Sequence, residues 1–394
     1  MNQNLQKLFS IAQKKEKLGI GLMSGTSLDG LDIALCRFTG NGLQTQFNLL
    51  KFITILYQEK FKKEVQSIFA RRDADLEKVC LLNAFIGNFH GELVLQALAE
   101  WGIELAEVDF IASHGQTIYH APKRLHQQPG YPNATLQIGD ADHLAVKTGI
   151  LTISDFRQKH IAAGGEGAPL ALYGDVLLGS RAGENRILLN IGGIANLTFL
   201  PANGDDSKIV CTDIGPGNTM IDAACRKYFK MPYDEDSKIA FAGKVNEPLL
   251  NQLLEHPFFS EQSPKTTGPE LFNLAYLDRA QTQSGSIDIS PEDIICTLSA
   301  FTAKSIADFI LKNFEADNIR IFASGGGARN IYIINYLKKV LTEATIEDTG
   351  ALGIDPDAKE AILFALLGNE ALCGEPLKIG ANPAVLMGKF SVPV

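Results

Sequence analysis

Two short apolar segments separated by a polar, glycine-bearing turn form the first strong pattern in the chain. The segment LGIGLM (18–23) is apolar throughout, and the turn SGTSLDG (24–30) follows it. Beyond this turn the apolar side chains alternate, at Leu31, Ile33 and Leu35, with the period of two that is typical of a β-strand. The pattern therefore predicts a hairpin of two strands joined by a small polar turn.

A helical pattern runs from about Phe61 to Trp101, and VDFIASHGQ (108–116) then predicts a buried strand that ends in a polar turn. The second half of the chain follows the same plan with different letters. NRILLNIGGIANLTFLP (185–201) predicts a second hairpin, and KIVCTDIGPGN (208–218) predicts a strand with a turn.

A long region of helix and loop extends to about Phe314, and NIRIFASGGGARN (318–330) completes the second half. In this order FIASHGQ and IFASGGG take equivalent places in the two halves. We interpret the parallel as an ancient duplication of one structural unit, with chance similarity as the alternative.

The length of 394 residues exceeds the size at which one hydrophobic core usually stops growing, so we expect two domains. We place the first domain at residues 1–145, joined by the C-terminal segment 370–394, and the second at 146–369. The connecting segment 149–175 contains the glycine and alanine cluster AAGGEGAP, which fits a hinge or a substrate loop. An ordinary mobile surface connection is the alternative.

Charge and composition narrow the kinds of partner. The chain has 36 basic and 45 acidic residues, a net charge of −9, and the signs are interspersed, so nothing predicts a nucleic-acid surface. The six cysteines are widely spaced and include no CxxC pair, which indicates reduced, mostly buried thiols. Residues 1–17 lack the apolar stretch of a signal peptide and no apolar run reaches membrane-spanning length, so we expect a cytoplasmic protein with no membrane partner.

Glycine-rich turns carry the candidate chemistry, because an acidic protein has to bind polyphosphate locally. No P-loop of the form GxxxxGK[ST] occurs, and GIGLMSG is followed by a strand where a dinucleotide fingerprint requires a helix. In the first hairpin turn, the backbone N–H groups of Gly25, Thr26 and Ser27 are suited to phosphate oxygens, and the two hydroxyls add donors.

Two further glycine turns follow in the second half. GPGN (215–218) lies between Asp213, at the end of a predicted strand, and a predicted helix whose N-terminus favours anions. GGG (325–327) ends another predicted strand, where adenine or ribose can approach the backbone. Three such turns in this order resemble the sugar kinase, actin and heat-shock chaperone ATPase superfamily. That resemblance implies an α/β, two-domain actin-like ATPase fold of the duplicated ribonuclease H-like type, with the active site in the interdomain cleft.

A finer resemblance covers nearly the whole chain. The strings GLMSGTSLDGLD, ASHGQTIYH, LQIGD, DFRQKHIAAGGEGAPL, LNIGGIANLT, DIGPGN and SGGGARN are similar to those of the anhydro-N-acetylmuramic acid kinases. The resemblance implies an enzyme of bacterial cell-wall recycling that uses ATP and Mg²⁺ to convert 1,6-anhydro-N-acetylmuramic acid into N-acetylmuramic acid 6-phosphate and ADP. It also implies a homodimer.

The chemistry of this acceptor assigns a role to one carboxylate. In the anhydro sugar O6 is tied to C1, so the ring has to open as the phosphoryl group is transferred. A carboxylate that deprotonates a water for attack at C1 allows O6 to leave and take the γ-phosphoryl group. By the resemblance, Asp213 is this catalytic base. The alternative is an Asp that caps the turn at Gly215.

By the same resemblance, residues 25–32 match the ATP-binding segment of the family. Within it, Asp29 or Asp32 is expected to hold Mg²⁺ directly or through water, since Mg²⁺ prefers oxygen ligands. The sequence does not decide between them, and a turn role for Asp29 or an edge charge at Asp32 is the alternative. The candidate nucleotide-binding residues are Gly25, Thr26, Ser27, Leu28, Asp29, Gly30, Leu31, Asp32, Gly215, Gly217, Asn218, Gly325, Gly326 and Gly327.

Polar side chains at two predicted strand ends are candidates for the sugar. Arg157 is suited to the lactyl carboxylate, because a guanidinium can bind it bidentately; an ion pair with Asp155 or another carboxylate is the alternative. Glu360 matches a family string, with a first-turn helix carboxylate as the alternative. The candidate substrate-binding residues are Ser113, His114, Gln116, Asp155, Arg157, Glu166 and Glu360.

One segment departs from the family pattern. PKTTGPELFN carries Pro269 where many relatives are expected to have a basic residue, whereas Lys265 and Glu270 are present. Two other functions remain open: an actin-like switch that binds ATP for a partner without a small-molecule acceptor, and a kinase of another small sugar. The DFR and AAGGEGAP strings favour the anhydro-sugar kinase, because a pure switch has no need of a sugar loop.

Overall fold

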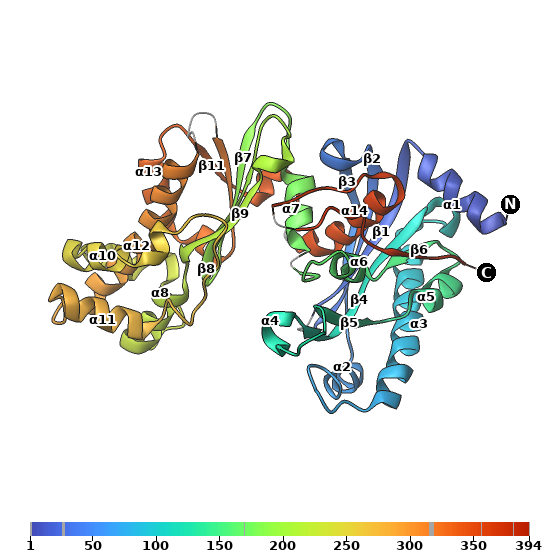
Figure 1. Cartoon of the computed structure of the whole chain (residues 1–394), viewed down its shortest axis with the longest axis horizontal. Helices are drawn as coiled ribbons and strands as arrows, with labels where there is room; N and C mark the ends of the chain where they lie inside the picture. Colours follow the sequence, from blue (N-terminus) through green and yellow to red (C-terminus); the bar gives the residue numbers. More distant parts are fainter. Residues whose placement is uncertain are drawn as a thin grey trace. The chain divides into compact units, whose positions relative to one another are not determined.

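The computed structural model describes residues 2–25, 28–168, 170–314, 319–355, 357–380 and 382–393. The chain divides into two compact units (Figure 1). Unit 1 comprises Met1–Leu178 and Asp355–Val394, and unit 2 comprises Gly179–Ile354.

A mixed sheet forms the centre of unit 1. It lies in the order β12-β6-β4-β1-β2-β3, and β5 pairs with β4. Strands β1, β2 and β3 are antiparallel neighbours, whereas β1, β4 and β6 run parallel, so the carboxyl ends of these three lie at one edge. The strands are β1 (Glu16–Ser24), β2 (Gly30–Thr39), β3 (Gln46–Leu56), β4 (Phe110–Ala121), β5 (Ala134–Ile138), β6 (Thr152–Ser154) and β12 (Lys389–Ser391).

Helices cover both faces of this sheet. The long helix α3 contributes Ile86 and Val94 to the core beneath the hairpin, and α14 packs on β1, β2 and β4. The backbone of α14 approaches closely, since a Cβ at Gly21 would collide with the carbonyl oxygen of Ala361. The helices are α1 (Gln3–Gln13), α2 (Glu59–Gln66), α3 (Leu76–Trp101), α4 (Lys123–His126), α5 (Ala141–Thr148), α6 (Phe156–Ala162), α7 (Ala171–Gly179) and α14 (Lys359–Cys373), with single 3₁₀ turns at Gly42–Gln44 and Leu105–Glu107.

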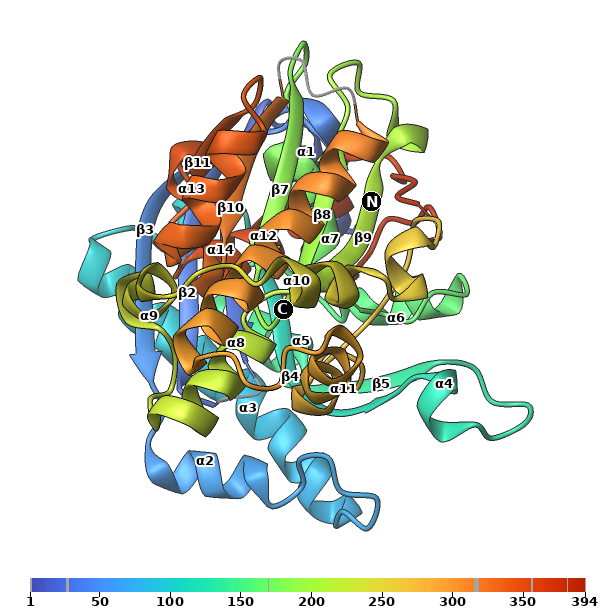
Figure 2. The ribbon, with the colours of Figure 1, turned by 90° about the vertical axis from the view of Figure 1, so that its left-hand side faces the viewer.

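The predicted hairpin and the helical region after it are confirmed. Leu31, Ile33 and Leu35 are fully buried in β2, as their alternation predicts. The predicted end of the next strand is wrong, because β4 does not stop at its polar residues. Gly115, with φ of 70°, bends β4, and the strand continues to pair with β5 in an arm that extends away from the sheet with α4 (Figure 2).

Unit 2 repeats the strand plan of unit 1. Its sheet has the order β11-β10-β7-β8-β9, in which β7, β8 and β9 are antiparallel and β10 lies parallel to β7, as β4 lies parallel to β1. The strands are β7 (Asn185–Ile191), β8 (Ile194–Leu200), β9 (Val210–Pro216), β10 (Ile319–Ser324) and β11 (Thr345–Asp348). The repeated order confirms the duplicated, actin-like α/β fold, and it confirms that FIASHGQ and IFASGGG occupy equivalent strands.

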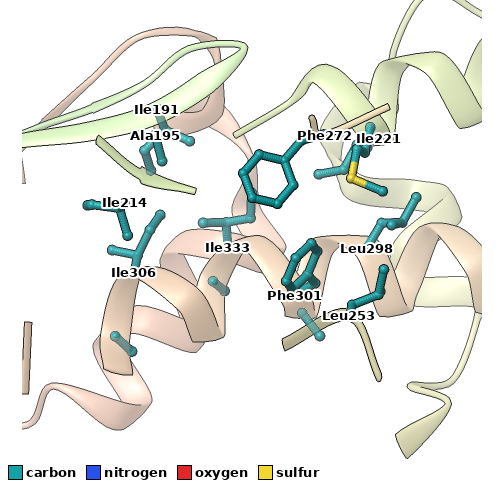
Figure 3. Close-up of a cluster of buried hydrophobic side chains, with 14 of the residues drawn as sticks. Ile191, Ala195, Ile214, Ile221, Leu253, Phe272, Leu298, Phe301, Ile306 and Ile333 are labelled. Atoms are coloured by element: carbon teal, nitrogen blue, oxygen red, sulfur yellow. The ribbon is translucent and has the colours of Figure 1, made fainter. Parts of the chain in front are cut away.

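Helix α12 (Pro291–Asn313) is the centre of the core of unit 2. Its Phe301 and Ile306 lie with Phe272 and with Ile214 of β9 in one buried cluster (Figure 3). Among the described residues it is the one helix long and apolar enough to cross a membrane, with a mean hydropathy of 1.6, but 78% of that window is buried inside the protein. The core therefore accounts for its apolar character.

The other helices of unit 2 surround α12 (Figure 2). They are α8 (Thr219–Ala224), which continues as a π-helical turn over Cys225–Phe229, α9 (Lys238–Ala242), α10 (Glu247–Leu254), α11 (Leu274–Ser284) and α13 (Ile331–Val340). Short 3₁₀ turns lie at Asp206–Lys208, Glu235–Ser237, Pro257–Ser260, Gly326–Arg329 and Thr349–Leu352.

The division between the units lies later in the chain than the expected boundary at 145/146. Strand β6 follows that boundary but pairs with β4, and α6 and most of α7 stay with unit 1. The chain returns to unit 1 at Asp355, before the expected position 370, because α14 packs on the sheet of unit 1. Strand β12 then pairs with β6.

Candidate functional site

The first glycine turn leaves the carboxyl end of β1. Thr26 and Ser27 lie outside the described residues. On either side of them, the Gly25 carbonyl accepts a hydrogen bond from the N–H of Leu28 at 3.3 Å. Leu28 has φ of 58°, a left-handed conformation that is strained for a leucine, and its side chain is buried in the core. Burial of this one side chain therefore fixes the far side of the turn.

A buried hydrogen-bonded chain fixes the near side of the turn. The Nε2 of Gln116 donates to the Gly25 carbonyl at 3.3 Å, and its Oε1 accepts from the Ser24 hydroxyl at 2.6 Å. The Tyr57 hydroxyl lies 2.9 Å from Ser24 Oγ and 2.9 Å from Nε2 of His90. All of these side chains are buried, and burial lowers the pKa of His90 to about 4. Both polar ends of the Gln116 side chain are thus hydrogen-bonded to the turn and to Ser24, whereas the sequence pattern predicts that Gln116 contacts the sugar.

The two acidic candidates of this turn differ in their surroundings. Asp29 is exposed, and its carbonyl accepts from the N–H of Tyr57 at 3.0 Å. Asp32 lies on β2, where its Oδ1 accepts from the Thr54 hydroxyl at 2.6 Å. Burial raises the pKa of Asp32, and the charges of Asp357 and Asp29 raise it further against the opposing bond from Thr54. A cation beside Asp32 would relieve this repulsion, and a carboxylate oxygen is a ligand of the kind that Mg²⁺ prefers.

Polar side chains also gather where β6 ends and β4 bends at Gly115. The Nη2 of Arg157 lies 3.1 Å from Nε2 of His114, whose ring packs 4.9 Å from that of Phe364. Burial, and then the charge of Arg157, lower the pKa of His114 to about 3, so the ring is neutral and accepts from the guanidinium. The Arg157 Nε and the His114 Nδ1 are buried without a partner among the described residues.

The other substrate candidates of unit 1 have separate partners. Asp155 forms an ion pair with Lys389 instead of Arg157, and Glu166 pairs with Arg124 at 2.9 Å. Ser113 is buried, and its hydroxyl accepts from the N–H of Gly115. Glu360 is exposed in the first turn of α14, and its charge acts on Arg157.

A polar cavity of about 300 Å³ opens at this edge of unit 1. Its walls include His114 from β4, Ser154 and Asp155 from the end of β6, and Lys389 from β12. It is lined in full by Asn83, His114, Gly115, Gln137, Ile138, Gly139, Asp140, Ala141, Asp142, Ser154, Asp155, Lys389 and Ser391. The unpartnered polar atoms of this region suit it to a small hydroxylated molecule.

The glycine-rich segment after α6 folds over a histidine. The N–H of Gly167 donates to Nδ1 of His160 at 2.9 Å, and a Cβ at Gly165 would collide with the His160 ring. The close approach to the His160 ring therefore requires glycine at 165, and the sequence pattern alone contains no sign of this contact. Glu166 lies within this segment.

In unit 2, Asp213 occupies the middle of β9, not its end. Its N–H donates to the Lys265 carbonyl at 3.0 Å, and its Oδ2 accepts from the N–H of Thr267 at 2.9 Å. Burial raises the pKa of Asp213, the Thr267 bond opposes this, and Glu270 adds to the rise. Pro269 lies exposed in the same segment.

The glycine turns of unit 2 meet at the β7–β8 hairpin. The N–H groups of Gly217 and Thr219 donate to the Gly193 carbonyl, and that of Asn218 donates to the Gly192 carbonyl. These N–H groups at the start of α8 therefore already have carbonyl acceptors. The expectation that they bind an anion assumed free N–H groups, so it loses its basis. The cluster 325–327 lies against the same hairpin: a Cβ at Gly325 would lie 2.7 Å from the Ile191 carbonyl oxygen.

Several of these residues have no signal in the sequence. Gly192 and Gly193 form the turn of the predicted second hairpin, β7–β8, the counterpart of β1–β2 in the repeated sheet, but the sequence pattern places the second phosphate turn at GPGN and does not include these two glycines. Tyr57 and His90 come from distant segments and meet only in the fold. No group of three or more His, Cys, Asp or Glu side chains suited to a metal ion occurs within the described residues.

Comparison with known proteins identifies the family. The model of the family described as anhydro-N-acetylmuramic acid kinase matches residues 17–390. The protein of that name from Pseudoalteromonas atlantica is 52% identical over 400 residues, which is 100% of both chains. The one from Caldanaerobacter subterraneus is 38% identical over 98% of this chain and 100% of its own.

Solved structures match less closely. The activator of 2-hydroxyisocaproyl-CoA dehydratase from Clostridium difficile, with bound ADPNP, is 12% identical, covers 90% of this chain and 95% of its own, and has a TM-score of 0.37. This likeness is too distant to bear on activity. The family match and the curated relatives are sufficient: the chain belongs to the anhydro-N-acetylmuramic acid kinase family and is a kinase.

Proposed function

We propose that this kinase transfers the γ-phosphoryl group of ATP to O6 of 1,6-anhydro-N-acetylmuramic acid while water opens the anhydro ring. The names of its relatives supply the acceptor. In the proposed reaction, water adds to C1, the bond between C1 and O6 breaks, and O6 forms a bond to phosphorus as ADP leaves. The products are N-acetylmuramic acid 6-phosphate and ADP, of use in recycling the cell wall.

The surroundings of Asp213 carry this proposal. Its Oδ2 is held by the N–H of Thr267, whereas no hydrogen bond to Oδ1 occurs among the described residues. One oxygen is thereby oriented, and the other is available to take a proton from water. A raised pKa makes this carboxylate a better base than an ordinary surface aspartate. We therefore assign the proton of the attacking water to Asp213.

We assign ATP to the glycine turns of both units. The turn after β1 is anchored on its two sides at Gly25 and Leu28, which supports a role as a phosphate cradle. In unit 2 we add Gly192 and Gly193, because their hairpin is the counterpart of that turn, and we keep the cluster 325–327 for the adenosine. When bound, Mg²⁺ would neutralise charge on the phosphates, with Asp32 or Asp29 holding it directly or through water.

We assign the sugar to the edge of unit 1 where β6 ends and β4 bends at Gly115. The Arg157 guanidinium is ordered by His114 and retains unpaired donors, which suits the lactyl carboxylate. The polar cavity beside His114 offers donors and acceptors for hydroxyl and acetamido groups. Ser113 and Gln116 then support this edge from within the core, and Asp155, Glu166 and Glu360 remain candidates for direct contacts.

A product assay tests the proposed function. The protein is incubated with Mg·ATP and 1,6-anhydro-N-acetylmuramic acid, and the sugar is analysed by mass spectrometry and ³¹P NMR. We expect stoichiometric ADP and N-acetylmuramic acid 6-phosphate. ADP without phosphorylated sugar would contradict the proposal and favour an ATP-binding switch. Parallel incubations with N-acetylmuramic acid and N-acetylglucosamine test for a kinase of another small sugar.

A further inference from the structure

Lys265 is a buried lysine that no step of the proposed reaction uses. Its ammonium donates to the carbonyl of Phe258 at 2.6 Å. The same Nζ lies 4.1 Å from the centroid of the Phe258 ring and 5.6 Å from that of Phe309 on α12. A cation held by one carbonyl and two aromatic faces is fixed in position, because each contact weakens when it moves.

The backbone of the same residue is bonded to strand β9. The N–H of Lys265 donates to the Thr212 hydroxyl at 3.0 Å, and its carbonyl accepts from the N–H of Asp213 at 3.0 Å. Two residues later, Thr267 donates its N–H to the Asp213 carboxylate. The segment 265–267 therefore lies along β9, with one end fastened by a buried side chain and the other against the carboxylate.

We propose that Lys265 is a positioning residue for the catalytic base: its side chain holds the segment 265–267 in register with β9, and so keeps the Thr267 N–H on Oδ2 of Asp213. Lys265 touches neither substrate in this account. The inference rests on the proposed function, because it gives Asp213 the role of base.

Different neighbouring groups shift the pKa of Lys265 and the pKa of Asp213. Burial lowers the pKa of Lys265, Glu261 opposes this, and Lys312 of α12 adds to the fall. Asp213 in turn faces Glu270, which raises its pKa, and the Thr267 N–H, which lowers it. Its partner on β8, Asn196, is uncharged. Displacement of the segment would remove the Thr267 N–H, which favours the ionised carboxylate, so the pKa of Asp213 would rise.

The first test is the pH profile of kcat in Lys265→Met, which keeps the length of the side chain and removes the ammonium. Loss of a hydrogen bond to a charged group corresponds to about one to two pKa units. We expect the acid limb of the profile to move up by about that amount, with activity partly recovered at higher pH. An acid limb that overlays that of the unmodified enzyme overturns the proposal.

Lys17 provides a matched control. It is also buried, and its Nζ donates to a backbone carbonyl, that of Lys14, at 2.9 Å, but it lies in unit 1. Lys17→Met should lower thermal stability without moving the acid limb. An equal shift in both variants would mean that the pH profile reports only general loosening of the fold, and would overturn the positional role.

A second readout does not depend on activity. With ¹⁵N-threonine labelling, the amide signal of Thr267 should titrate with Asp213 in the unmodified chain, and it should lose that titration in Asp213→Asn and in Lys265→Met. Titration retained in Lys265→Met overturns the inference. If Lys265→Met does not fold, Phe309→Leu, which removes one aromatic face and keeps the lysine, should give a smaller shift in the same direction, and no shift would be contrary to it.

The two proposals fail separately. Full turnover in Asp213→Asn would remove the base role, and with it the proposed mechanism, whatever Lys265 does. Loss of turnover in Asp213→Asn, together with unchanged pH profile and amide titration in Lys265→Met, would leave the base in place and remove only the role of Lys265.

Discussion

The Tyr57 hydroxyl and Nε2 of His90 lie 2.9 Å apart. The direction of the hydrogen bond between them follows from the other hydrogen bonds that link them to Gln116. The Nε2 of Gln116 faces two carbonyls, so its Oε1 must accept from the Ser24 hydroxyl. Ser24 then accepts from Tyr57, whose single proton is used, and His90 must donate its Nε2 proton to Tyr57. The bonds donated by His90, Tyr57 and Ser24 therefore lead in one direction to Gln116, whose Nε2 donates to the Gly25 carbonyl of the glycine turn.

Tyr57→Phe should therefore weaken the turn as well as the core. The change removes the donor to Ser24, which keeps its bond to Gln116, and the acceptor of the His90 Nε2 proton, at a cost of about 1–3 kcal/mol in stability. We expect the KM for ATP to rise by about two- to tenfold, corresponding to one lost hydrogen bond, with a smaller change in the KM for the sugar. Thermal unfolding and initial-rate kinetics measure the two effects.

Tyr276→Phe is the matched control, since the buried Tyr276 hydroxyl donates to the Leu253 carbonyl in the core of unit 2. It should lose stability without a change in the KM for ATP. If both variants change that KM equally, the chain from His90 has no special connection with the turn.

Strand patterns, unlike contacts between distant segments, could be predicted from sequence. The alternation at Leu31 and Ile33 identified β2 because one face of the strand meets the core. Asp213 was expected at a strand end, since its glycines resemble a terminal turn, but β9 continues through Gly215 by pairing with Ala195 of β8. Gln116 was also expected at a strand end, because the continuation of β4 beyond the bend at Gly115 depends on pairing with β5, which lies later in the chain.

Arg157→Met tests the assignment of the sugar carboxylate. The methionine keeps much of the length and removes every donor, so a charged hydrogen bond to substrate would be lost. We expect the KM for the sugar to rise by about ten- to a hundredfold, while the KM for ATP changes little. Arg37→Met, at an exposed arginine paired with Glu16, should change neither value. An unchanged sugar KM in Arg157→Met would place the carboxylate elsewhere.

Asp32→Asn has an effect on stability that depends on pH. Burial raises the pKa of Asp32 in the folded chain, so the ionised group costs stability at pH values above the folded pKa, and the cost disappears as pH falls below the unfolded value. Without Mg²⁺, the variant should have a higher Tm than the unmodified chain at neutral pH, and the difference should shrink as the pH is lowered through the folded pKa. Thermal unfolding across this range measures it.

The same variant identifies the residue that holds Mg²⁺. If Asp32 is that residue, Asp32→Asn should raise the Mg²⁺ concentration needed for half-maximal turnover. Asp29→Asn should raise that concentration by a smaller amount. The opposite order would assign the ion to Asp29. A Tm difference in Asp32→Asn that grows as the pH falls would contradict the burial argument.

Asp213→Asn tests the base directly. The amide keeps the acceptor for the Thr267 N–H but takes no proton from water. We expect kcat to fall by about 10²–10⁴-fold, the usual contribution of a general base, while ATP still binds. Calorimetric titration with ATP and single-turnover kinetics separate the two steps. Near-normal kcat would refute the role.

The central claim is that water attacks C1 while O6 takes the phosphoryl group, and reaction in ¹⁸O-water tests it most directly. The product is quenched rapidly, and unlabelled N-acetylmuramic acid 6-phosphate held in the same water for the same time corrects for exchange at C1. We expect one ¹⁸O atom at C1 of the sugar and none in the phosphate. Label in the phosphate, or unlabelled C1 in a phosphorylated sugar, would contradict ring opening by water.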